Sequence, residues 1–271
     1  MFINMVRFLV MRMEEERLVL LNENDHEIKG NITRPKRTGK FPLVVIAHDL
    51  LDNSETSYIK ECAKWFLDHG MAVARFDFTH GFGKSGGLVE HATISQRARD
   101  LELVIQECRR KKYVFDNKIS VLAFGFGAMA TLAMEGFKFL CKAIILVNTP
   151  SAIDETVWTA FPEREMMRVR LKRYFHIQRN GEQVRMNSTF FEDGIRLDLF
   201  RCVRNLKTPV LYMHSAENKH VALYHLERLA ERTNAKTETT VLGGAGHELG
   251  KKQVILVSES TFAFLKKQRA I

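Results

Sequence analysis

The residues with the clearest chemical meaning follow an apolar run in the middle of the chain. Residues 119–128, ISVLAFGFGA, are typical of a buried strand, a sharp turn and the start of a helix. Enzymes expose a nucleophilic serine on such a turn, in the pattern G-x-S-x-G, so that its hydroxyl attacks a carbonyl carbon. Here residues 123–127 read AFGFG, and Gly125 stands at the place of the serine. The pattern predicts the backbone of this turn without its nucleophile.

A histidine and a carboxylate follow other apolar runs. His48 and Asp49 come directly after residues 43–47, and His247 closes the segment GGAGH after residues 237–241. A histidine at such a place can take a proton as a general base. His247 is therefore a candidate base, with a structural hydrogen-bonding role as the alternative.

The elements that must position these residues alternate along the chain. Mostly continuous apolar runs, typical of parallel strands covered on both faces, predict eight strands, of which the first two form a hairpin: 17–22, 27–33, 43–47, 71–76, 119–123, 143–147, 209–213 and 237–241. Amphipathic segments between or after them predict helices at 55–69, 93–111, 126–137, 221–232 and 253–267. This alternation predicts an α/β fold with a doubly wound, mostly parallel eight-stranded sheet and right-handed crossovers.

One segment interrupts the alternation. Residues 151–206 separate two sheet strands by more than a crossover needs, and they include a turn signal at Asn180-Gly181. We interpret 151–206 as a helical cap or lid insertion and 1–150 with 207–271 as the core. The cap is expected over the carboxyl edge of the sheet, where open α/β folds bind ligands.

In this order, the motifs resemble those of the α/β-hydrolase superfamily, and within it the small serine esterases and acyl hydrolases, including the cinnamoyl/feruloyl esterase-like branch. VVIAHD at 44–49 resembles the third strand with its H-G oxyanion turn, and RFDFTHGFGKSGG at 75–87 resembles the loop D-x-x-G-x-G-x-S-x-G. PVLYMHSAEN at 209–218 resembles the strand that carries the catalytic acid, and GGAGH at 243–247 resembles the loop of the catalytic histidine. The resemblance covers nearly the whole chain and implies the α/β-hydrolase fold.

The resemblance also assigns the positions of a catalytic triad. The nucleophile position is Gly125, the acid position is Asn218 and the base position is His247. In this chemistry the serine attacks, the histidine accepts its proton and the carboxylate stabilises the imidazolium. Glycine supplies no reacting atom and asparagine no charge, so ordinary serine hydrolysis is not expected. The glycine also removes strain of about 1–3 kcal/mol from the turn, which favours survival of the fold.

Two further departures affect the predicted oxyanion site. Asp49 replaces the glycine of the H-G turn and would oppose a developing oxyanion if its side chain points inward. His80 adds one residue to the loop after Asp77, which changes the expected path of that loop.

Other residues are candidates to replace the missing groups. Glu217 and Asp154 follow strand ends and are possible acids for His247, with solvated loop carboxylates as the alternative. Ser215 is a weak candidate nucleophile, because the resemblance places glycine there, facing the acid.

The pocket and its ligands can be predicted only by class. We expect His48, Asp49, Phe124 and Phe126 to line it, with the two phenylalanine rings either receiving an apolar ligand or filling the vacancy above Gly125. Tyr174 and His176 could contact an anionic ligand, although exposed helix positions are the default interpretation.

Charge and composition limit the classes of partner that we expect for this protein. The net charge is +9, and seven Lys/Arg residues oppose Glu165 and Glu182 between positions 164 and 185. Such a basic run attracts anionic molecules, but no nucleic-acid-binding motif accompanies it, so nucleic acid is an unlikely partner. Four widely spaced cysteines indicate reduced thiols and a cytoplasmic protein, without a metal site or cofactor. The apolar segment 1–10 is too short for a membrane span, and the oligomeric state is not predicted.

The leading hypothesis is therefore a pseudo-hydrolase that binds a small apolar or anionic molecule, or a protein partner, without hydrolysing esters. The first alternative is an enzyme that needs no nucleophile and uses His247 as a general base. The second is a residual carboxylic-ester hydrolase with a non-standard site.

Overall fold

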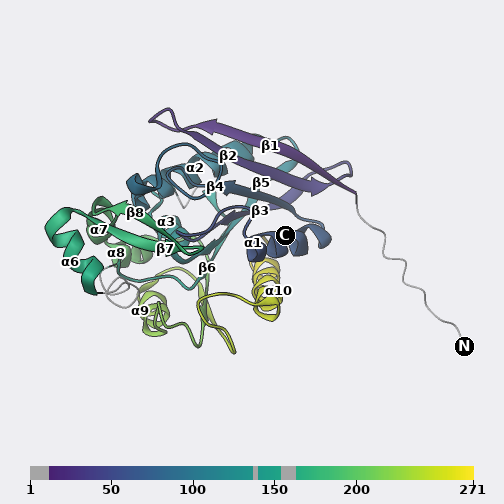
Figure 1. Ribbon diagram of the computed structural model, residues 1–271. Coiled ribbons are helices and arrows are strands. Elements are labelled where there is room, and N and C mark those ends of the chain that lie inside the picture. Colours follow the sequence, from purple (N-terminus) through teal and green to yellow (C-terminus); the bar gives the residue numbers. More distant parts are fainter. Residues whose placement is uncertain (1–11, 137–139, 154–162) are drawn as a thin grey trace, which may run out of the picture.

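A computed structural model describes residues 12–136, 140–153 and 163–271. Its sheet has eight strands in the order β1-β2-β4-β3-β5-β6-β9-β10. Figure 1 shows β1 at one edge of this sheet, with β2 beside it. The strands are β1 (Met13–Leu21), β2 (Glu27–Pro35), β3 (Phe41–Ala47), β4 (Ala72–Asp77), β5 (Val114–Phe124), β6 (Ala143–Val147), β9 (Val210–Ser215) and β10 (Thr237–Leu242). The β1–β2 and β2–β4 pairs are antiparallel, and the other pairs are parallel. The predicted doubly wound, mostly parallel sheet is confirmed.

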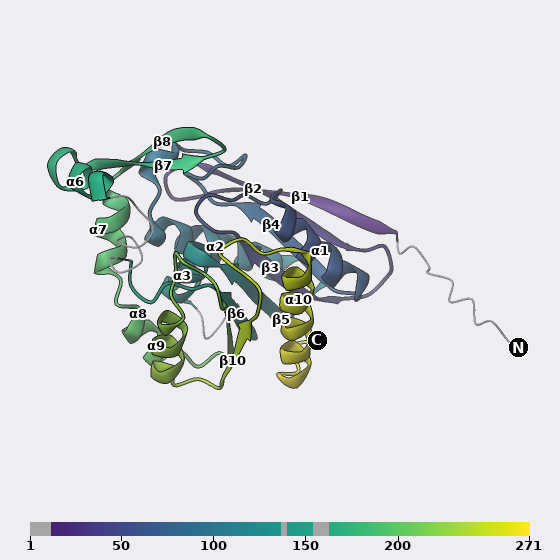
Figure 2. The same ribbon diagram turned by 60° about the horizontal axis from the view of Figure 1, so that its bottom comes forward.

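Helices cover both faces of this sheet. The two that pack on one face are α1 (Ser57–Asp68) and α10 (Lys251–Lys267) (Figure 2). The helices on the other face are α2 (Ile94–Arg110), α3 (Gly125–Ala133), α8 (Leu199–Asn205) and α9 (Tyr224–Arg232). The strands between them are apolar on both sides because each face is buried; all five residues of β6, for example, are buried.

Between β6 and β9 the chain adds helices and a second, smaller sheet. Here lie α6 (Glu163–Lys172), α7 (Thr189–Arg196) and α8, with the antiparallel hairpin of β7 (Tyr174–Arg179) and β8 (Glu182–Asn187). A helical insertion was expected, and the hairpin was not. Its turn is Asn180-Gly181, where both residues have positive φ, 52° and 82°. This geometry suits a two-residue hairpin turn, so the Asn-Gly signal gave the turn correctly but not the strands around it.

The long loop after β4 is held by a buried carboxylate and a short 3₁₀ turn (Val89–His91). Asp77 accepts hydrogen bonds from the amides of Ser54 and Lys84, both at 2.7 Å. His80 adopts a positive φ of 55°, and its amide donates to the carbonyl of Gly86 at 2.9 Å. The additional residue is thus absorbed in a loop closed by hydrogen bonds, in which His80 itself is buried. Across the three described ranges, no helix is long and apolar enough to cross a membrane.

Candidate functional site

The predicted turn is present at the junction of β5 and α3. Strand β5 ends at Phe124, and α3 begins at Gly125, whose φ is 51°. That backbone conformation costs energy for any residue with a Cβ atom, and glycine adopts it freely. The turn therefore keeps the geometry that raises a nucleophile above a sheet, and its central residue has no side chain.

The space above Gly125 is filled by Asp49. A Cβ atom added to Gly125 would overlap the carboxyl carbon and both carboxylate oxygens of Asp49. Asp49 follows β3, which is hydrogen-bonded to β5 in the sheet, so their carboxyl ends lie side by side. The inward orientation of Asp49 that the sequence left open is thus the one observed. A carboxylate from a neighbouring strand end stands where a serine side chain would project.

One oxygen of this carboxylate accepts hydrogen bonds from the two backbone amides of the predicted oxyanion site. Oδ1 of Asp49 accepts hydrogen bonds from the amide nitrogens of Leu50 and Phe126, both at 2.7 Å. In this fold the amide after the nucleophile and an amide from the loop after the third strand form the oxyanion hole. The Leu50 and Phe126 amides are therefore well placed to bind an oxyanion, but the Asp49 carboxylate already accepts their hydrogen bonds.

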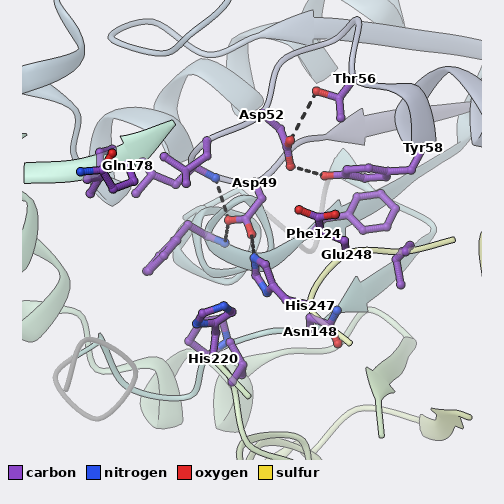
Figure 3. A pocket seen from close by; sticks show the side chains of 18 of the residues that line it. Asp49, Asp52, Thr56, Tyr58, Phe124, Asn148, Gln178, His220, His247 and Glu248 are labelled. Atoms are coloured by element: carbon purple, nitrogen blue, oxygen red, sulfur yellow. Dashed lines mark hydrogen bonds and ion pairs between the residues drawn. The ribbon is translucent and has the colours of Figure 1, made fainter. Parts of the chain in front are cut away.

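The other oxygen faces His247. Oδ2 of Asp49 lies 3.8 Å from Nε2 of His247, and Figure 3 shows the imidazole pointing at the carboxylate. The distance is longer than a hydrogen bond, so the contact is an ion pair only when the imidazole is protonated. The His247 side chain is 40% exposed and packs edge to face on His220, with ring centroids 4.9 Å apart. His247 is thus at the site and accessible from solvent.

Asn218, the residue at the acid position, forms hydrogen bonds within its own loop. Oδ1 of Asn218 accepts the amides of His220 and Val221 at 3.0 and 3.1 Å. Within the described part of the chain, no hydrogen bond or ion pair joins His247 to Asn218 or to Glu217. Glu217 is exposed, and its amide donates to the carbonyl of Ala245. The structure thus gives neither residue the contact that a catalytic acid needs.

The remaining candidate replacements lie elsewhere. Ser215 is 1% exposed, and its hydroxyl accepts a hydrogen bond from Nδ2 of Asn148 at 3.1 Å, while its amide donates to Oδ1 of Asn148. This buried pair joins the ends of β6 and β9. Asn148 lines the cavity, whereas Ser215 is not among the residues that line it. Asp154 lies outside the described residues.

Two buried residues, His48 and Arg97, support the turn that carries Asp49. Nδ1 of His48 donates to the carbonyl of Asp49 at 2.7 Å, and its Nε2 accepts the amide of Phe78 at 3.2 Å. Burial, together with the charge of Arg97, lowers the pKa of His48 to about 3, so this imidazole is neutral. His48 therefore holds the backbone at Asp49 and is not among the residues that line the cavity.

Arg97 is a buried residue at this site that the sequence analysis did not single out. Its guanidinium is fully buried, donates to the carbonyl of Leu50 at 3.3 Å and lies over the ring of Phe78 at 4.6 Å. Burial lowers the pKa of Arg97 to about 10, and Asp49 opposes that shift, so the group stays charged at neutral pH. The sequence did contain a signal for Arg97, because this arginine stands at a core-facing position of the amphipathic helix pattern.

A cavity of about 590 Å³ opens above Gly125. Apolar and aromatic side chains near Asp49 form much of its wall: Tyr58, Phe124, Phe126, Ile177, Val221 and Leu249. Asp52 accepts the Tyr58 hydroxyl at 2.6 Å, and burial raises the pKa of both groups. Phe124 and Phe126 line the cavity, and the Asp49 carboxylate takes the space above Gly125.

The segment between β6 and β9 supplies the polar wall. Arg164, His176, Gln178 and Gln183 line the cavity here. Glu165 is buried; burial tends to raise its pKa, but hydrogen bonds from the His176 amide and Arg168 outweigh this and lower it. Tyr174 lies outside the lining residues and packs against His176 and Arg185.

Most of the predicted basic run is paired within the protein. The paired residues and their partners include Arg164 with Glu165, Arg168 with Glu165 and His176, Arg173 with Glu192, Arg179 with the Leu51 carbonyl and the Phe82 ring, and Arg185 with Glu90 and the Tyr174 ring. Much of this charge therefore holds the inserted segment together and is not reserved for a ligand.

Known structures share this architecture. Est1E from Butyrivibrio proteoclasticus, solved with ferulic acid bound, is similar at a TM-score of 0.80 with 17% identity over 94% of this chain and 100% of that one. The α/β hydrolase GrgF from Penicillium sp. sh18 gives 0.76, with 17% identity over 95% and 100%. Mouse α/β hydrolase domain-containing protein 10 gives 0.75, with 15% identity over 93% and 99%. These likenesses show that the chain has the fold of α/β hydrolases.

The chain belongs to the acyl transferase family, whose model matches residues 15–264. An acyl transferase from Shewanella hanedai is 23% identical over 199 residues, which are 72% of this chain and 64% of that protein. The match thus spans slightly less than two thirds of the relative.

Proposed function

We propose that this protein is a member of the acyl transferase family that binds a small molecule in its cavity and carries out neither serine acyl transfer nor ester hydrolysis. The observation that carries the proposal is the Asp49 carboxylate over Gly125, with its Oδ1 on the amides of Leu50 and Phe126. No hydroxyl is present there to attack, and an ester carbonyl would have to displace an anion from the oxyanion site. Both steps of acyl-enzyme formation are disfavoured together.

The ligand class follows from the wall of the cavity. A neutral, largely apolar body matches Phe124, Phe126 and Ile177, and a polar end matches Arg164 and Gln178, which also line the cavity. An anionic group is disfavoured beside Asp49 and is better placed near Arg164. Because ferulic acid is bound in the structure of Est1E, methyl ferulate and ferulic acid are suitable first probes.

The test combines binding with two assays of acyl chemistry. Purified protein should bind methyl ferulate by calorimetry, leave it intact by chromatography and remain unlabelled by a fluorophosphonate. Ester turnover that His247→Ala abolishes, or a fluorophosphonate adduct on a serine, would overturn the proposal.

A gain-of-function experiment addresses the same point. Gly125→Ser alone should give negligible ester hydrolysis, whereas Gly125→Ser with Asp49→Gly and Asn218→Asp should give a detectable rate. Groups that act as a unit contribute in a strongly non-additive way. Activity of the single variant at the level of the triple variant would show that Asp49 does not block the site.

The second candidate is an enzyme with His247 as a general base. The specific observation in its favour is the contact of Nε2 with Asp49 at 3.8 Å, together with the position of the imidazole in the cavity wall. A carboxylate beside the imidazole stabilises its protonated form after it takes a proton from a bound molecule. Exchange of deuterium from solvent into a bound carbon acid, lost in His247→Ala, is the measurement for this candidate.

A further inference from the structure

The two oxygens of Asp49 have different surroundings. Oδ1 is fixed by the amides of Leu50 and Phe126, whereas Oδ2 points towards Nε2 of His247. The Asp49 side chain is 15% exposed and lines the cavity. A carboxylate with one oxygen anchored in the oxyanion site and the other directed to a cavity is arranged as a nucleophile is.

We infer that Asp49 is a nucleophile towards alkyl electrophiles, and that the protein hydrolyses an apolar alkyl compound bearing a leaving group through an alkyl ester of Asp49. This activity goes beyond the proposed binding function and uses the same cavity. Carboxylates form covalent intermediates of this kind, and their attack on a saturated carbon does not require an empty oxyanion site.

The first step forms the ester. Oδ2 attacks the substrate carbon, the bond from carbon to the leaving group breaks, and the leaving group departs with the electron pair as an anion. The apolar and aromatic wall around Asp49, including Phe124 and Phe126, fits the alkyl chain and limits hydration of Oδ2. Arg164, His176 and Gln178 provide a polar wall to which the anion can move.

The second step hydrolyses the ester, and it uses the Leu50 and Phe126 amides, which still donate to Oδ1 after the first step. His247 takes a proton from water, and the resulting hydroxide adds to the carboxyl carbon of the ester. Negative charge then develops on Oδ1, which already accepts the Leu50 and Phe126 amides at 2.7 Å. The bond from that carbon to Oδ2 breaks, the departing alkoxide takes the proton from His247, and the carboxyl group of Asp49 releases its proton to solvent.

The position of His247 fits this step. Its Nε2 is 3.8 Å from Oδ2, too far for a direct hydrogen bond but close enough for both groups to hold one water molecule. The neutral His48 and the buried Arg97 hold the 48–50 turn, which keeps Oδ1 at the amides during both steps.

The probe is 1-bromohexane, and the readouts are released bromide and the mass of the protein. We expect bromide release above the rate in buffer, with Asp49→Asn at least about a hundredfold slower. His247→Gln should release about one bromide per protein and retain a hexyl group on Asp49, because general-base catalysis contributes about a hundredfold to ten-thousandfold. The matched control is Asp116→Asn, an exposed carboxylate on β5 without a role in the cavity.

Isotope labelling keeps the test independent of how well the variants fold. In a single turnover of the unmodified protein in H₂¹⁸O, the label should enter Asp49, and hexanol should carry ordinary oxygen. Label in hexanol alone would overturn the inference, because it means direct attack by water. No bromide release together with no adduct in His247→Gln would overturn it as well. Neither result bears on the proposed function, which fails separately through ester turnover or fluorophosphonate labelling.

Discussion

At Gly125 two physical effects act against any side chain. The φ of 51° places the residue in the left-handed region, and the Asp49 carboxylate occupies the space above it. Glycine at position 125 and aspartate at position 49 are therefore coupled, because a side chain at 125 would overlap the Asp49 carboxylate.

The coupling predicts non-additive stability. Gly125→Ser should destabilise the protein by about 2–4 kcal/mol, from backbone strain and from overlap with Asp49. Adding Asp49→Gly should recover part of that loss, although Asp49→Gly alone also removes hydrogen bonds to Leu50 and Phe126. Urea unfolding of the four proteins measures the interaction energy, and additive effects would contradict the overlap.

His48 predicts how stability depends on pH. Its pKa is about 3 in the folded protein, because of burial and Arg97, against an ordinary value of 6.5 in the unfolded chain. The unfolded state therefore binds more protons as the pH falls below 6.5, and the stability that neutral His48 contributes above that pH is lost progressively towards pH 3. The loss approaches about 1.4 kcal/mol per pH unit for one group. Urea unfolding at pH 7.5 and pH 5 should show this loss in the native protein but a smaller one in His48→Gln; equal pH dependence would mean that His48 is protonated when folded.

At the scale of elements, the β7–β8 hairpin connects backbone geometry to the cavity. Ile177, Gln178 and Gln183 from the two strands line the cavity, and the turn between them depends on positive φ at Asn180 and Gly181. A Cβ atom on Gly181 would meet nothing within 4 Å, so only backbone strain opposes a substitution there. The hairpin can thus be weakened without changing any cavity residue.

Gly181→Val should cost about 1–2 kcal/mol locally, because valine disfavours positive φ. Hydrogen exchange should accelerate at the amides of β7 and β8, and binding of methyl ferulate should weaken. Gly39→Val is the matched control, since Gly39 also has positive φ and open space around it but lies in the β2–β3 loop. Unchanged exchange in β7 and β8 would show that the hairpin does not depend on its turn.

For the whole molecule, the net charge of +9 acts at longer range than any contact in the cavity. Arg168 holds the buried Glu165, whereas the side chain of Arg173 is 70% exposed despite its contact with Glu192. The basic run between Arg164 and Arg185 therefore contains residues that stabilise the inserted segment and residues that contribute mainly to the surface potential. The two groups should respond differently to substitution.

Binding of an anionic probe should weaken as salt rises, since exposed charges are screened over about 8–10 Å near physiological ionic strength. Arg170→Ala with Lys172→Ala and Arg173→Ala should reduce this salt dependence, and Arg168→Ala should mainly lower the unfolding temperature. Fatty acids, aromatic acids and a mixed nucleic-acid pool are the probes, at low and high salt. Binding indifferent to salt and to the triple change would leave the basic run without a role in binding.

The sequence by itself determined the sheet, the order of the motifs and the glycine at the centre of the strand–helix turn, because apolar periodicity and glycine-rich turns act over short stretches of chain. It also placed Asp49, Asn218 and His247 at strand ends on one edge. Only the tertiary structure decided what these residues contact. Asp49 and Phe126 are 77 positions apart, and their hydrogen bond depends on β3 lying beside β5 and on the support of buried Arg97. Side-chain direction at a strand end follows from such packing, so the carboxylate in the oxyanion site could not be read from the residue types alone.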